Sequence, residues 1–181
     1  MEVRRPNILK WLRKLFSTEK AEELITSSLF IRSDEAELKD FFEQIYDIEK
    51  FCKWFNFFPI VWLSFDKKYF DVGCTGTIRF SLPPFYYKLQ VVKIVPYESI
   101  EMIAIGNTLE GRALFTFRKN GDGYVFEDPH YLTGKNMLIH KYYTLLLAPN
   151  HEAFMNWRYS VLKKNLINET LNKKKGKLHN D

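Results

Sequence analysis

The sequence predicts an α+β domain in which a curved antiparallel sheet of about seven strands wraps around one long C-terminal helix, with two short helices after the first strand. Three observations lead to this fold class. Apolar and polar residues alternate with a period of two from Pro59 onward, as in half-buried strands. Residues 149–171 carry apolar side chains at helical spacing, without a further Pro or Gly. A single long helix is therefore available to cover the sheet.

Residues 1–20 predict a separate amphipathic, basic helix ahead of the domain. This segment holds six Lys or Arg and two Glu, and Pro6 suits the first turn of a helix ending near residue 16. Two interpretations stay open: the helix lies in an anionic membrane surface, or it docks on its own domain or on a partner. The apolar face in either case is Ile8, Leu9, Trp11, Leu12, Leu15 and Phe16.

The main domain is expected over residues 21–172 and opens with a strand at residues 23–32. Asp34 is the expected N-cap of the first short helix, since a Glu follows it at capping-box spacing. Asp47 is the expected N-cap of the second short helix.

Six more strands are expected after the two short helices, each bounded by turn residues. They cover residues 61–66, 77–82, 88–95, 99–107, 112–118 and 124–131. Asn120-Gly121-Asp122-Gly123 is the strongest hairpin signal among the turns. Residues 135–147 are apolar almost all round, so they are expected to be buried or to form an aromatic-rich flap.

The long helix is expected to begin at Pro149, because a proline disfavours helical geometry at the preceding residue, and Asn150 is its expected N-cap. Arg158 lies near the middle of the apolar face. This position suits either a core helix with a paired Arg or the wall of a binding cavity. Residues 173–181 are rich in Lys and are expected to form a basic disordered tail.

Composition narrows the function classes. The chain of 181 residues is 46% apolar with 16 Phe and 10 Tyr, which suits a large aromatic core or a hollow lined by rings. No apolar run is long enough to span a membrane, and Cys52 and Cys74 give no disulfide framework. The positive charge belongs to the two ends of the chain. We therefore expect a cytoplasmic protein, at most peripheral to a membrane, with no nucleic-acid partner.

Short motifs follow one another in a characteristic order between residues 24 and 170. They are Phe30-Ile31-Arg32-Ser33, Trp54, Asp71-Val72-Gly73, Val95-Pro96-Tyr97-Glu98, Gly106-Asn107-Thr108-Leu109-Glu110-Gly111 and the hairpin at residues 120–123. In this order the chain resembles the START-like or SRPBCC superfamily, which includes the polyketide cyclase/dehydrase-like proteins. The resemblance implies the helix-grip fold and a hydrophobic ligand, such as a lipid, sterol, quinone or polyketide, held between sheet and helix. Some members are enzymes and many are not.

Local motifs give no support for a cofactor or a metal. The histidines lack metal-ligand spacing and no glycine-rich phosphate loop is present, so neither is expected. Asp128 and His130 lie two residues apart on one strand face and could act as a general acid and base, as a cyclase or dehydratase requires. The alternative interpretation is a polar strand end beside Pro129.

We expect the domain to bind a hydrophobic small molecule without converting it. Burying about ten methylenes contributes roughly 8 kcal/mol, against about 1 kcal/mol for one hydrogen bond, so apolar area should dominate affinity. Arg158 is the expected polar handle. The expected ligand-binding residues are Phe80, Met102, Phe115, Phe126, Tyr143, Trp157, Arg158 and Val161. Two other classes stay open: an enzyme using Asp128 and His130, and a protein-interaction module with a filled core.

Overall fold

The computed structural model describes residues 23–81 and 84–178, with side chains described over residues 24–81 and 84–173. The predicted helix of residues 1–20 therefore lies outside the described residues. Among the helices of the described part, none is both long enough and apolar enough to cross a membrane.

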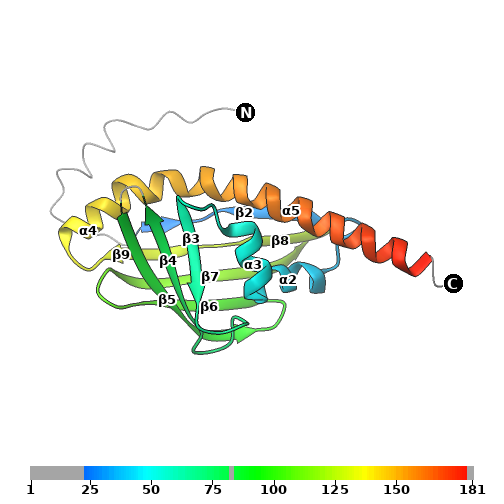
Figure 1. Cartoon of the computed structure of the whole chain (residues 1–181), viewed down its shortest axis with the longest axis horizontal. Helices are drawn as coiled ribbons and strands as arrows, with labels where there is room; N and C mark the ends of the chain where they lie inside the picture. Colours follow the sequence, from blue (N-terminus) through cyan, green and yellow to red (C-terminus); the bar gives the residue numbers. More distant parts are fainter. Residues whose placement is uncertain (1–22, 82–83, 179–181) are drawn as a thin grey trace.

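Nine strands form one antiparallel sheet (Figure 1). They are β1 (Glu23–Ile25), β2 (Ser28–Arg32), β3 (Val61–Phe65), β4 (Thr75–Ser81), β5 (Pro84–Val95), β6 (Ser99–Ile105), β7 (Leu109–Asn120), β8 (Gly123–Glu127) and β9 (His130–Gly134). The helices in the described residues are α2 (Leu38–Tyr46), α3 (Ile48–Phe55), α4 (Met137–Tyr142), the π-helix η1 (Tyr143–Leu147) and α5 (Ala148–Leu178).

The strands follow the order β1-β9-β7-β6-β5-β4-β3, and β2 pairs with β8. β7 pairs with β9 along its first half and with β8 along its second half. α5 runs along the open side of the curved sheet, while α2 and α3 lie near one end (Figure 1). This arrangement confirms the predicted α+β fold, with a curved sheet, a long C-terminal helix and two short helices near the start of the domain.

Two strands that were predicted as continuous are interrupted at the same level of the sheet. The strand predicted at 23–32 divides into β1 and β2, and the strand predicted at 124–131 divides into β8 and β9. Between the halves, the Ser27 amide donates to Asp128 Oδ1 at 2.7 Å and the Asp128 amide donates to the Ser27 carbonyl at 3.2 Å. Pro129 has no amide to donate, so the regular ladder cannot run through it. The interruption holds the Asp128 side chain inside the fold.

One of the three predicted helix caps is confirmed. The Asp47 carboxylate accepts hydrogen bonds from the amides of Glu49 and Lys50 and caps α3. The prediction for Asp34 is wrong, because Glu37 is the N-cap residue of α2 and its side chain makes no capping bond. Asp34 lies three residues before this cap and accepts a hydrogen bond from Arg32 Nη2 at 2.9 Å instead.

The long helix does not begin at Pro149 as predicted, because α4, η1 and α5 follow one another without interruption and Ala148 is helical (φ −57°). In the π-helical turn the Ala148 amide donates to the Tyr143 carbonyl, five residues back. Asn150 is not an N-cap; its side-chain amide donates to the Leu146 carbonyl at 2.7 Å. The helix also continues to Leu178, through the first part of the predicted tail, consistent with the high helix propensity of Lys and Leu.

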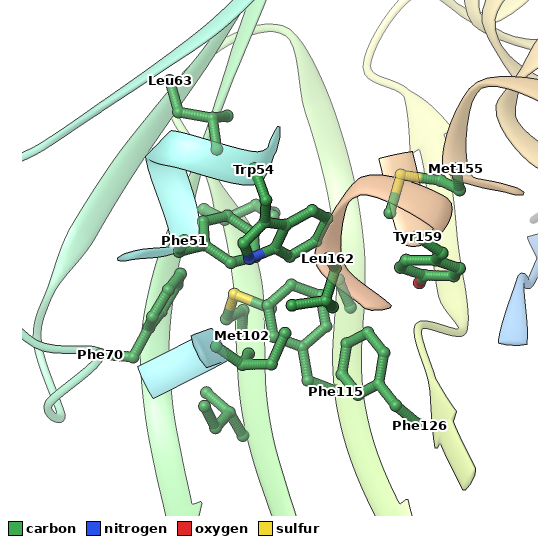
Figure 2. Close-up of a cluster of buried hydrophobic side chains, with 14 of the residues drawn as sticks. Phe51, Trp54, Leu63, Phe70, Met102, Phe115, Phe126, Met155, Tyr159 and Leu162 are labelled. Carbon is green, nitrogen blue, oxygen red and sulfur yellow. The ribbon is translucent and has the colours of Figure 1, made fainter. Parts of the chain in front are cut away.

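Aromatic side chains fill the half of the interior next to α2 and α3 (Figure 2). Trp54 is fully buried and donates its indole N–H to the Gln44 carbonyl at 3.0 Å. Its ring centroid lies 4.9 Å from that of Phe51 and 6.1 Å from that of Tyr159 on α5. Ring pairs of this kind add about 0.5–1.5 kcal/mol each to the free energy gained by burial. This half of the interior is solid, whereas the half beneath η1 is not.

Candidate ligand cavity

A cavity of about 330 Å³ lies between the sheet and the helical segment that runs from η1 into α5. This volume falls within the range of small-molecule sites. The sheet contributes apolar and aromatic side chains, among them Ile78, Tyr87, Leu89, Val91, Met102 and Phe115. The helical wall includes Tyr143, Leu147, Phe154 and Met155. Phe51 and Phe55 of α3 also line the cavity, on the side of the solid half. The lining suits an apolar ligand.

The sheet wall depends on a close contact between neighbouring strands. The Phe65 ring of β3 lies against Gly76 of β4, and both residues line the cavity. A Cβ atom at Gly76 would come within 2.4 Å of a Phe65 ring carbon. Only glycine therefore accepts the ring in this position.

The helical wall includes the π-helical turn. Wider turns of this kind often occur at functional sites. Here Tyr143 and Leu147 of η1 line the cavity, while Leu138 of α4 is exposed. The segment predicted at residues 135–147 as either buried or a flap is thus a helical wall with one side exposed.

Four of the predicted ligand-binding residues line the cavity and four do not. Those that line it are Phe80, Met102, Phe115 and Tyr143. Those that lie elsewhere are Phe126, Trp157, Arg158 and Val161. Phe126 is fully buried in the aromatic core, and the ring of Trp157 packs on Phe57 with a centroid distance of 4.7 Å. Only the first turns of α5 border the cavity, and the three predicted residues of this helix lie further along it.

Arg158 is a structural residue in this fold rather than a handle in the cavity. Its Nη2 donates to the Trp54 carbonyl, and its guanidinium lies 4.6 Å from the centroid of the Trp157 ring. Burial lowers the pKa of Arg158. An Arg in a core helix was expected to pair with another side chain. Arg158 instead contacts a backbone carbonyl and the face of an aromatic ring.

A polar cluster in the cavity wall joins the end of β8 to the start of α5. Asp128, His130 and His151 all line the cavity, and one possible ligand atom from each lies within 4.8 Å of those of the other two. His151 Nε2 lies 3.6 Å from Asp128 Oδ2, and His151 Nδ1 lies 3.3 Å from Ser27 Oγ. The rings of His130 and His151 meet edge to face with centroids 5.0 Å apart. The structure therefore adds His151 and Ser27 to the predicted pair.

The low polarity of the surroundings shifts each of these groups toward its neutral form. Burial raises the pKa of Asp128 to about 7, although the Ser27 amide and the nearby Tyr159 hydroxyl favour the carboxylate. Burial, together with the neighbouring His151, lowers the pKa of His130 to about 3. Burial also lowers the pKa of His151 to about 4. Both imidazoles are thus uncharged near neutral pH.

Local sequence spacing could not reveal this cluster. His151 lies 21 positions after His130 in the printed sequence and belongs to the opposite layer of the fold. The sequence offered one indication of this cluster. His151 lies at the start of the predicted long helix, which was expected to cover the sheet that contains Asp128 and His130.

Neither a protein-family model nor a curated protein matches this chain. Among solved structures, KanY aligns with a TM-score of 0.61 at 13% identity, over 81% of this chain and 98% of that one. A Thalictrum flavum norcoclaurine synthase mutant, solved with a transition-state analogue, aligns with a TM-score of 0.56 at 15% identity, over 82% and 98% of the two chains. DynU16, from the dynemicin biosynthetic locus, aligns with a TM-score of 0.56 at 13% identity over 80% of this chain. The present chain spans only 48% of DynU16.

These neighbours are helix-grip proteins of the SRPBCC, polyketide cyclase-like group. At such low identity the likeness concerns the fold. The chain thus has the helix-grip fold that these neighbours share, as the resemblance in its sequence predicted.

Proposed function

We propose that this protein binds an apolar small molecule with one polar end in the cavity between the sheet and α5. The observation that carries the proposal is a cavity of about 330 Å³ with a mostly apolar lining and a polar cluster in its wall. Apolar area supplies most of the affinity, since each buried methylene contributes about 0.8 kcal/mol. The polar cluster orients the ligand, in the role that was expected of Arg158.

A fluorescence titration with anilinonaphthalene sulfonate, an apolar probe with one charged end, tests the proposal. Leu147→Trp should fill the cavity from its helical wall and weaken probe binding at least tenfold, while the circular dichroism spectrum stays unchanged. Leu171→Trp is the matched control, because Leu171 is an exposed residue further along α5. Equal probe binding by both variants would contradict the proposal. Mass analysis of an organic extract of the native protein then identifies the natural ligand.

A second candidate is an enzyme that uses Asp128 and His130 as general acid and base. The observation that favours it is that both side chains reach the wall of the cavity, rather than forming an exposed strand end. Incubation with the extracted ligand should then change the mass of that ligand, and His130→Ala should abolish the change while retaining ligand binding. A ligand recovered unchanged from the wild-type protein would count against catalysis.

The third class, an interaction module with a filled core, fits the structure less well. It requires a solid interior, and the space beneath η1 is hollow. An apolar hollow of this size favours a small-molecule occupant.

A further inference from the structure

We propose that Asp128, His130 and His151 bind a divalent first-row transition metal ion in the wall of the cavity. Two imidazoles and one carboxylate form a ligand set that suits zinc or ferrous iron. The inference does not rest on the proposed function, because a metal can bind whether or not an organic ligand does.

The spacing of the donor atoms is close to that of a metal site. Zinc ligands at about 2.0–2.2 Å in a tetrahedral arrangement lie about 3.4 Å from one another. His151 Nε2 and Asp128 Oδ2 are already 3.6 Å apart. The donor atoms of all three residues lie within 4.8 Å of one another. Small side-chain rotations can therefore close the set around one ion.

Asp128 Oδ2 supplies an independent observation. The Asp128 side chain is 1% exposed, and Oδ2 forms no hydrogen bond with any residue in the described part of the chain. The separation of 3.6 Å from His151 Nε2 is too long for a hydrogen bond. A buried carboxylate oxygen that faces two imidazoles, with the nearby Tyr159 hydroxyl outside hydrogen-bond geometry, is an arrangement that suits a metal ligand.

Outer contacts hold two of the three ligands in position. Ser27 Oγ contacts His151 Nδ1 at 3.3 Å, which leaves Nε2 directed toward Asp128. The Ser27 amide donates to Asp128 Oδ1 at 2.7 Å, which leaves Oδ2 as the available oxygen. Metal-binding histidines and carboxylates usually have such partners on their second donor atom. One residue at the break between β1 and β2 thus orients both side chains.

The position of the cluster indicates an open coordination sphere. All three ligands face a cavity whose other walls are mostly apolar. Three protein ligands leave at least one position of a tetrahedral ion free. The free position would accept the polar end of a molecule held in the cavity.

The test uses the full, tag-free chain after dialysis against a chelator. Calorimetric titration with Zn²⁺ should show one ion bound per chain. Addition of Co²⁺ should give the visible absorption bands of a low-coordinate site with nitrogen and oxygen ligands. Neither measurement needs an organic ligand, so failure of the metal proposal and failure of the ligand proposal are distinguishable.

Four variants locate the ion. Asp128→Asn, which keeps an oxygen for the Ser27 amide, and His151→Gln should each lower Zn²⁺ affinity by more than about 100-fold. Ser27→Ala should lower it by about 10-fold to 100-fold. His140→Gln is the control and should change affinity less than about threefold, because this buried imidazole contacts Thr133 outside the cluster.

Two results would overturn the proposal: no Zn²⁺ binding at micromolar concentrations, or binding that survives His151→Gln. His151 lies on the helix and is only partly buried, so this variant remains informative if Asp128→Asn fails to fold.

Discussion

Replacing Trp54 by alanine tests whether the fold depends on the solid half of its interior. The indole is fully buried and its ring contacts those of Phe51, Phe55 and Tyr159. It also donates a hydrogen bond to the Gln44 carbonyl. Truncation of a buried Trp costs about 3–5 kcal/mol, and the carbonyl loses its donor. Since a domain of ordinary stability unfolds with about 5–15 kcal/mol, Trp54→Ala should remain folded but much weakened.

The assay is urea denaturation followed by circular dichroism, because fluorescence would change with the loss of the indole itself. In a domain of this size the midpoint of thermal unfolding should fall by about 6–20 °C. Trp54→Phe keeps a ring but loses the N–H donor, so we expect a smaller loss of about 1–3 kcal/mol. Trp62→Ala is the matched control, since Trp62 is only partly buried and its ring contacts that of the exposed Phe58.

A loss below about 1 kcal/mol for Trp54→Ala, or a loss equal to that of Trp62→Ala, would refute the reasoning. Either result would mean that the aromatic cluster does not hold α3 and α5 together.

Three further predictions concern single features of the chain. Asp47→Ala should lower the free energy of unfolding by about 1 kcal/mol through loss of the α3 cap, whereas Asp34→Ala should change it by less than about 0.5 kcal/mol in the same denaturation assay. Arg158→Met should leave the affinity for anilinonaphthalene sulfonate unchanged in a fluorescence titration, because Arg158 lies outside the cavity; a loss of tenfold or more would restore it as the handle. Deletion of residues 1–16 should weaken sedimentation with anionic vesicles, and unaltered sedimentation would exclude the membrane hypothesis for this segment.

Some features that depend on neighbouring residues were predicted correctly, whereas several that depend on distant contacts were not. The Asp47 cap and the helix after it were predicted correctly, because a cap needs only the residues that follow it. The start at Pro149 was predicted wrongly, because the helix is continued there by a π-helical turn packed against the sheet. Local propensity favours a break at a proline, and tertiary packing outweighed it.

The candidate site shows the same division. Asp128 and His130 were predicted as a pair because they are close in the sequence, whereas His151 reaches them only because the start of α5 lies beside the last strands. Arg158 was assigned to the cavity because it lies inside the apolar arc of its helix. Along its length this arc faces first the cavity and then the solid core. Apolar residues line both, so the sequence pattern does not distinguish them.

The sequence by itself determined the order of helices and strands and the α+β class, since hydrophobic period and turn residues act over a few positions. Only the tertiary structure decided which apolar residues pack against one another and which surround a hollow, because that depends on how the helices pack against the sheet. It also decided that Ser27, Asp128, His130 and His151 meet in one place. Side chains far apart in the chain become neighbours only when the sheet bends and the long helix lies across it.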